Sequence, residues 1–179
     1  MIEHDVIAQA TPMPILVAPQ AVLRQKTRLV RPEDMDGLRT IIPACSRPYQ
    51  APGIGLAAPQ VGLGMRFAIV DVSDKDGPRN PIVLINPEVI AETDSMAARE
   101  EGCLSLPNQY AEVVRPEAVR VRYQDMEGKV QELEADDLLA TCLQHEIDHL
   151  EGILFVDHLS TLKRNMIMRR LAKEQRQKH

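Results

Sequence analysis

The chain has 179 residues, of which 44% are hydrophobic and 26% charged, and its formal net charge is −5. This composition suits one domain with its own hydrophobic core and excludes a largely disordered chain. No apolar run approaches the roughly 18 residues of a membrane span, and the first residues lack the pattern of a signal or transit peptide, so we expect a cytoplasmic protein.

Short elements are expected in the first part of the chain. Residues 1–13 are predicted to be a poorly ordered extension, and residues 14–17 a short strand. The proline in residues 31–34 favours the start of a helix, which Pro43 and Pro48 are expected to stop.

The middle of the chain is predicted to be rich in β-strands. Residues 51–60 contain many small residues and are expected to form a tight loop where backbone can approach a ligand closely. A turn at residues 125–128 indicates a hairpin. The short apolar or alternating runs that predict strands are residues 66–72, 82–85, 110–114, 118–124 and 130–134.

Two helices are expected near the end of the chain. Asp136 or Asp137 can cap the first, whose largely apolar pattern predicts burial, and Gly152 can stop it. A short apolar run at residues 153–156 follows. The second helix is expected to begin at Ser160, with the apolar stripe Leu162, Met166 and Ile167. Together the elements predict an α+β fold, with small antiparallel sheets packed around one buried metal-binding helix and a C-terminal helix.

Charge divides the chain into an acidic body and a basic end. Residues 160–179 carry seven lysines and arginines against the single acid Glu174, a net charge of +6, which leaves −11 for residues 1–159. This predicts three parts: the extension 1–13, a catalytic body 14–159 and a basic helix 160–179. The helix is expected to meet a polyanion, although a solvated helix facing its own acidic body would give the same pattern.

The sequence QHEIDHLEG at residues 144–152 indicates a metal site. His145 and His149 stand one helical turn apart on one face, and Glu146 projects from the neighbouring edge. Histidines on an apolar helix face are often core residues bonded to a carbonyl group. However, chance rarely produces the HExxH pattern, so we favour a metal site with its own base.

A catalytic metal site usually takes three protein ligands and leaves one position open. Cys142 lies on the histidine face, but its distance from His149 of about 10.5 Å along the helix axis favours a core residue. Cys103, between Gly102 and Pro107, could be brought alongside the helix, although an isolated cysteine is often only a small buried hydrophobic residue. Cys45 completes an odd set of three cysteines, which argues against a disulfide framework.

Three stretches together resemble the signature motifs of peptide deformylase: GIGLAAPQ at residues 53–60, EGCLS at 101–105 and QHEIDHLEG at 144–152. They occur in the order and at spacings comparable to those of the family, from about residue 14 to the final helix. The resemblance implies that Cys103, His145 and His149 bind one Fe²⁺, with Zn²⁺, Ni²⁺ or Co²⁺ able to replace it.

The resemblance also implies the reaction. Metal-bound water would attack the formyl group of N-formylmethionine on a nascent polypeptide and release formate, with Glu146 as general base and acid. Gln60 and the backbone N–H of Leu104 would hold the oxyanion. The expected partners are formylmethionyl peptides and nascent chains, with possible docking of residues 160–179 on the ribosome; neither membrane nor DNA is expected.

The residues that match the family's substrate pocket depart from it in places. Thr141 stands where some members have a larger apolar side chain, and Tyr110 where some carry an arginine that helps to hold the peptide. Pro43 and Pro48 interrupt a segment that is continuous helix in many members. The expected pocket for the methionine side chain consists of Ile54, Leu138, Thr141, Cys142 and His145, with Gly55 holding the peptide through its backbone.

Two other functions are compatible with parts of the pattern. A zinc endopeptidase would share the HExxH motif, but Phe155 occupies the position of the third histidine in the long protease motif, and His158 lies three residues beyond that position. Other zinc endopeptidases use a downstream glutamate as third ligand, and Glu174 lies in a segment unsuited to that role. A non-catalytic module with a structural metal site would have no need of Glu146 beside the ion.

Overall fold

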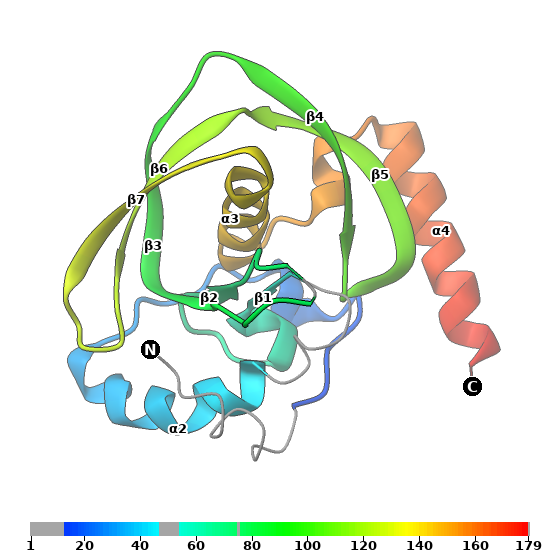
Figure 1. The fold of residues 1–179 in the computed structure, drawn as a ribbon. Helices are drawn as coiled ribbons and strands as arrows, with labels where there is room; N and C mark the ends of the chain where they lie inside the picture. Colours follow the sequence, from blue (N-terminus) through cyan, green and yellow to red (C-terminus); the bar gives the residue numbers. More distant parts are fainter. Residues whose placement is uncertain (1–12, 47–53, 75, 179) are drawn as a thin grey trace.

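The computed structural model describes residues 13–46, 54–74 and 76–178. Its strands curve around one central helix, and a second helix lies against the outside of the C-terminal part of the fold (Figure 1). The described strands form a five-stranded sheet in the order β1-β2-β3-β6-β7 and a two-stranded sheet, β4-β5, and every pairing is antiparallel. The predicted α+β class, with small antiparallel sheets around a helix, is confirmed.

The five-stranded sheet contains most of the predicted strands. The turn at residues 125–128 joins β6 to β7 as predicted, and the Gly128 N–H donates to the carbonyl of Asp125 (2.9 Å). Strand β3 continues well beyond the predicted residues 82–85, because pairing with β6 resumes after two register shifts, one across Pro87 between Ile85 and Glu88 and one between Val89 and Ala91. The strands are β1 (Gly55–Ala57), β2 (Phe67–Val70), β3 (Ile82–Glu92), β6 (Ala118–Gln124) and β7 (Val130–Asp136).

The two-stranded sheet is a long hairpin of β4 (Met96–Cys103) and β5 (Leu106–Pro116). The sequence did not predict β4, whose alanines and charged residues lack the apolar alternation of a strand. Strand β4 is stabilised by continuous pairing with β5, from Met96 opposite Pro116 to Gly102 opposite Tyr110. This pairing also extends β5 beyond the predicted residues 110–114, and it places Cys103 at the end of a strand.

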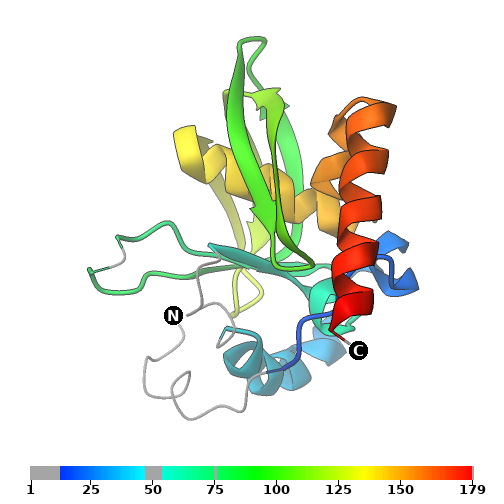
Figure 2. The ribbon, with the colours of Figure 1, turned by 90° about the vertical axis from the view of Figure 1, so that its right-hand side faces the viewer.

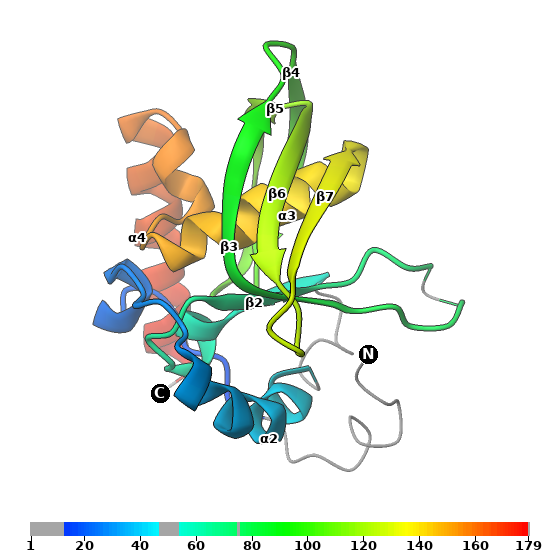
Figure 3. The same ribbon diagram turned by 90° about the vertical axis from the view of Figure 1, so that its left-hand side faces the viewer.

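Helix α3 (Asp137–Leu150) is the buried centre of the fold and is flanked by strands in two perpendicular views (Figures 1 and 3). Asp136 occupies the N-cap position, one of the two expected, although its side chain makes no capping hydrogen bond, and Asp137 is the first residue of the helix. Gly152 ends the helix as predicted. Its φ is +76°, and a side chain there would lie 2.5 Å from the carbonyl oxygen of Arg24.

The N-terminal part differs from the prediction at two places. Residues 14–17 form no strand, because they do not make a series of backbone hydrogen bonds to one neighbouring segment. A single hydrogen bond joins the Leu16 N–H to the carbonyl of Gln60 (2.7 Å). Helix α2 (Met35–Ser46) follows the 3₁₀ turn at residues 32–34 as expected but runs through Pro43. Burial of apolar residues on either side offsets the cost of a helix proline. Pro48 and residues 1–12 lie outside the described residues.

Helix α4 (Thr161–Gln177) packs against the outside of β5 and the 3₁₀ turn at residues 155–158, and Figure 2 shows it along one side of the molecule. Ser160 caps it as predicted by accepting a hydrogen bond from the Lys163 N–H (3.2 Å). The predicted stripe is only partly correct. Ile167 is buried together with Leu171, whereas Leu162 and Met166 are 71% and 51% exposed. No described helix is long and apolar enough to cross a membrane.

Candidate metal centre

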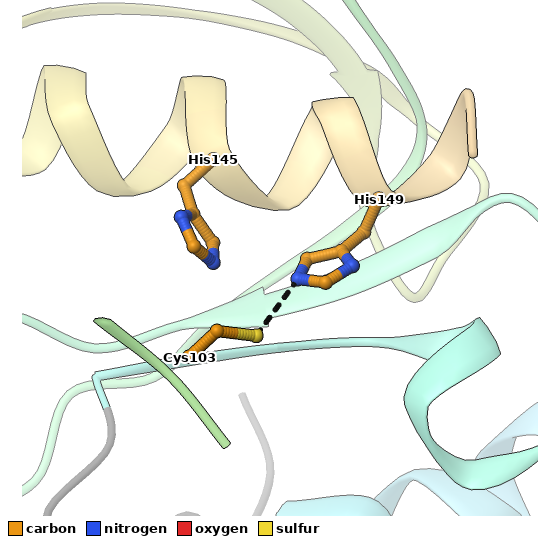
Figure 4. Close-up of side chains that lie close together, drawn as sticks. All are labelled: Cys103, His145 and His149. Carbon is orange, nitrogen blue, oxygen red and sulfur yellow. Dashed lines mark hydrogen bonds between the residues drawn. The ribbon is translucent and has the colours of Figure 1, made fainter. Parts of the chain in front are cut away.

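The end of β4 and the middle of α3 bring three potential ligands together. One donor atom each from Cys103, His145 and His149 lies within 4.8 Å of the others. The Cys103 sulfur is 3.2 Å from Nε2 of His149, and both imidazole rings point from the helix toward it (Figure 4). Among the described residues, no other cluster of three or more histidine, cysteine or acidic side chains is close enough together to hold a metal ion.

A buried carboxylate fixes the orientation of His145. Nδ1 of His145 lies 2.9 Å from Oε1 of Glu101, so its Nε2 is directed to the side of Cys103. Glu101 also accepts two hydrogen bonds from Arg115, at 2.7 and 2.9 Å. Burial alone would raise the pKa of Glu101, but hydrogen bonds from His145 and Arg115 outweigh this effect and lower that pKa to about 2. The carboxylate is therefore ionised at neutral pH and holds the imidazole.

Arg115 joins this carboxylate to the far end of α3. Its guanidinium group also donates to Asp148 (2.8 Å), which lies 2.7 Å from Nε2 of His158. The Arg115 side chain is only 6% exposed. Removing its charge takes the guanidinium partner from two acidic groups near the metal centre and leaves each with only a histidine contact.

Replacing Arg115 by methionine is expected to lower the free energy of unfolding by about 3–5 kcal/mol, because the buried carboxylate of Glu101 would lose its counter-ion. Urea denaturation measures this loss. Arg122→Met is the matched control, since Arg122 also faces two carboxylates, Glu88 and Glu132, but is 48% exposed. It should cost less than about 1 kcal/mol. Equal losses in the two variants would show that the buried ion pairs of Arg115 stabilise the fold no more than the exposed ion pairs of Arg122.

The donor atoms fit one divalent transition-metal ion. A thiolate and two imidazoles suit borderline ions such as Fe²⁺ and Zn²⁺, and three protein ligands leave a coordination position for water or substrate. Cys142, as expected, does not belong to the group of ligands. It is instead a buried residue of the core, packed with Leu143 and Ile147.

Glu146 lies beside the potential ligands without belonging to them. Its Oε1 is 4.0 Å from Nε2 of His145, and its buried Oε2 has no hydrogen-bond partner in the described part of the chain. Burial raises the pKa of Glu146 to about 7. A side chain on Gly55 would come within 2.7 Å of this carboxylate, so the backbone of β1 packs directly against it. A carboxyl group in this position can accept and return a proton near neutral pH.

Gln60 is held with its amide nitrogen toward the centre. Its Oε1 accepts a hydrogen bond from the Ala57 N–H (2.8 Å), so Nε2 must point the other way. Nε2 lies 3.2 Å from Oγ of Ser105 and 3.4 Å from the Cys103 sulfur. The 3₁₀ turn at residues 58–61, which follows β1 where a loop was predicted, therefore presents a fixed donor beside the metal ligands.

A cavity of about 420 Å³ opens onto this centre. With the exception of His149, every residue that the sequence indicated for ligand, catalytic or substrate roles lines it. These residues are Ile54, Gly55, Gln60, Cys103, Leu104, Tyr110, Leu138, Thr141, Cys142, His145 and Glu146. Ile54, Tyr110 and Leu138 are 39%, 62% and 43% exposed, so large apolar groups surround a polar centre. Such a cavity fits a ligand with one polar reacting group and an apolar side chain.

Sequence reasoning missed the side chains that hold the ligands in place. Glu101 stands inside one of the recognised motifs, directly before the Gly-Cys pair, and this position could have drawn attention to it. Arg115 is a charged residue at an inward-facing position of an alternating strand, which is a signal of a buried ion pair. Ser105 ends the same motif as Glu101, whereas His158 carried no such signal.

The family model for polypeptide deformylase matches residues 12–165 of the chain. The chain belongs to the polypeptide deformylase family. Peptide deformylase from Agrobacterium fabrum (strain C58 / ATCC 33970) is 47% identical over 165 residues, which cover 92% of this chain and 97% of that protein. The enzyme from Rhizobium meliloti (strain 1021) is 49% identical over 160 residues, which cover 89% of this chain and 92% of that protein.

Solved structures of peptide deformylases share the fold. The crystal structure of the enzyme from Legionella pneumophila has a TM-score of 0.85 and 43% identity, and it covers 94% of this chain and 98% of that chain. The crystal structure of peptide deformylase from Ehrlichia chaffeensis in complex with actinonin has a TM-score of 0.82 and 29% identity, and it covers 93% of this chain and 99% of that chain. The expected family and the expected hydrolase activity are thus confirmed. Polypeptide deformylases are metal-using enzymes that remove the N-formyl group from nascent chains, and this chain has a Cys/His/His group suited to a metal.

Proposed function

We propose that this deformylase acts in the cytoplasm on N-formylmethionine at the start of nascent polypeptides and releases formate, using one divalent ion held by Cys103, His145 and His149. The convergence of these three donor atoms beside the buried carboxylate of Glu146 carries the proposal. The physiological ion is proposed to be Fe²⁺, with Zn²⁺, Ni²⁺ or Co²⁺ able to occupy the same donors.

The ion, when bound, supplies Lewis-acid chemistry that makes water a better nucleophile and polarises a carbonyl group. Glu146 accepts the proton of the attacking water and passes it to the leaving amine, a role suited to the raised pKa that its burial causes. Nε2 of Gln60 and the backbone N–H of Leu104 stabilise the negative charge on the formyl oxygen. Glu101 keeps His145 in the orientation in which its Nε2 can bind metal.

The apolar part of the cavity is proposed to receive the methionine side chain. Leu138, Thr141 and Cys142 line it from α3, and Ile54 lines it directly before β1. The backbone at Gly55 is proposed to hold the substrate as an added strand, because β1 is an edge strand of the five-stranded sheet. An extended peptide can then present its formyl group to the metal centre.

Formate release is the experiment that tests this function. The anaerobically purified protein should release formate from formyl-Met-Ala-Ser, lose this activity on chelation and regain it with Fe²⁺. We also expect actinonin, which is bound in the Ehrlichia chaffeensis structure, to inhibit the reaction. Cleavage of internal peptide bonds in peptides blocked at both ends, without formate release, would contradict the proposal and favour an endopeptidase.

Two contacts make the endopeptidase less suitable. The ring of Phe155, at the place of a third histidine, is buried and stacks on His145 with centroids 6.2 Å apart. Glu174, the downstream acid, lies on α4 and accepts a hydrogen bond from Gln109 (3.2 Å). The sequence thus supplies neither of the third ligands on which the zinc endopeptidases depend.

The basic helix α4 is proposed to dock on the ribosome, through ribosomal RNA or protein near the exit of the nascent chain. Its exposed bases include Arg169, Arg170 and Lys173, whereas Ile167 and Leu171 attach it to the body. In the described part of the helix, one ion pair joins a basic side chain of α4 to the body: Arg164 lies 3.9 Å from Asp157. Most of the positive charge is therefore available to a polyanion.

Changing Arg169, Arg170 and Lys173 together to glutamate is expected to reduce co-sedimentation with ribosomes by at least about 10-fold at low salt, since each base lost weakens contact with phosphate groups. Lys26, Arg31 and Lys129, all exposed and outside α4, provide the control when changed in the same way. Unchanged sedimentation of the α4 variant, or an equal loss in the control, would remove this part of the proposal.

A further inference from the structure

Tyr110 is a large aromatic residue that stands at the mouth of the cavity with 62% of its surface exposed. Its partner on the neighbouring strand is Gly102. A Cβ atom on Gly102 would lie 2.5 and 2.6 Å from Cε1 and Cδ1 of the Tyr110 ring. The ring therefore occupies the place of the missing side chain and lies against the backbone next to Cys103.

The direction of the Tyr110 ring follows from the alternation of side chains along β4 and β5. Glu101 points toward α3, where it bonds His145, and Arg115 and Val113 are buried on the same inward face of the hairpin. Neighbouring residues of a strand face opposite sides, so Gly102 and its partner Tyr110 face away from α3. The cavity thus extends from the metal centre, past the edge of β4, to an aromatic ring on the outer face.

Two strand edges border this cavity. Gly55 lies on β1, an edge strand of the five-stranded sheet, and residues 100–103 lie on β4, which pairs on one side only in the described structure. An extended peptide placed along these edges alternates its side chains as a strand does. If its first side chain points toward α3, where the proposed methionine pocket lies, the second points to the outer face and toward Tyr110.

We propose that Tyr110 determines the preference of the enzyme for the residue that follows formylmethionine, by offering its ring as an apolar platform to an aromatic or large aliphatic side chain. This inference rests on the proposed deformylase function and adds a selection at the second position of the substrate. The exposed face of the ring buries apolar surface only when such a side chain is present. Alanine is too small to make this contact.

The test compares kcat/KM for formate release from formyl-Met-Phe-Ser and formyl-Met-Ala-Ser. The unaltered enzyme should favour the phenylalanine peptide by about 3- to 10-fold, the range expected for one aromatic pair. Tyr110→Ala should bring the ratio close to one, mainly through KM, because the contact is equal in the ground and transition states. Tyr110→Phe should retain the preference. Val114→Ala, an exposed residue on the same face of β5 that does not line this cavity, should retain it too.

The inference is overturned if the unaltered enzyme shows no preference, if Tyr110→Ala keeps the full ratio, or if Val114→Ala loses it equally. In each of these cases formate is still released, so the proposed function stands. Absence of formate from both peptides with the metal-loaded, unaltered enzyme would contradict the proposed function, and the inference with it.

Discussion

Glu146→Gln is expected to lower kcat for formate release by about 10²- to 10⁴-fold and to leave the metal content at one ion per chain, because it removes a proton acceptor but no ligand. The glutamine side chain has nearly the same volume as glutamate, and it fits the narrow space beside the backbone of Gly55. Steady-state formate release and elemental analysis of the same preparation measure the two effects.

The matched control is Glu134→Gln on β7, which alters an exposed carboxylate paired with Arg120 outside the cavity. It should leave both kcat and metal content unchanged. Turnover by Glu146→Gln within a few-fold of the unaltered enzyme would assign proton transfer to another group. Loss of the ion from Glu146→Gln would instead make Glu146 a ligand, contrary to the role proposed for it.

Cys103→Ala is expected to abolish both metal retention and formate release. The change removes the one sulfur donor of the group and leaves two imidazoles. Loss of a group that merely hydrogen-bonds a ligand commonly weakens metal affinity by about 10- to 100-fold, so loss of the ligand itself should cost more. The ratio of metal to protein after anaerobic purification and dialysis measures this effect.

Cys45→Ala provides the control for loss of a thiol. Cys45 lies on α2 and is buried in the core, outside the group of ligands, and its replacement should reduce stability but not metal content. A full complement of metal in Cys103→Ala, or equal loss in both variants, would contradict the assigned ligand set.

The part of the site that lies on one helix could be predicted well from the sequence. The spacing of His145, Glu146 and His149 fixes their relative directions as soon as the segment is helical, and the apolar pattern predicts that helix. The position of Cys103 is different, because it depends on the path of β4, which the sequence pattern did not reveal. Only the ordered set of motifs placed Cys103 beside the histidines.

The features that prediction missed depend on tertiary contacts. Strand β4 is ordered by its pairing with β5 rather than by its own pattern, and α2 continues through Pro43 because the surrounding apolar residues are buried. The contact of Tyr110 with Gly102 joins residues opposite each other in one hairpin, and the ion pair of Glu101 with Arg115 joins its two strands four positions apart in register. Neither contact can be read from the sequence without the register of that hairpin.

X-ray absorption spectroscopy of the anaerobically purified protein tests the ligand set most directly. The spectrum at the metal edge should require one sulfur and two imidazole nitrogens, with oxygen from water completing the shell. In Cys103→Ala, any residual metal should show no sulfur contribution. A metal shell without sulfur in the unaltered protein, or one filled by four protein nitrogen and sulfur atoms, would contradict a three-ligand catalytic centre at Cys103, His145 and His149.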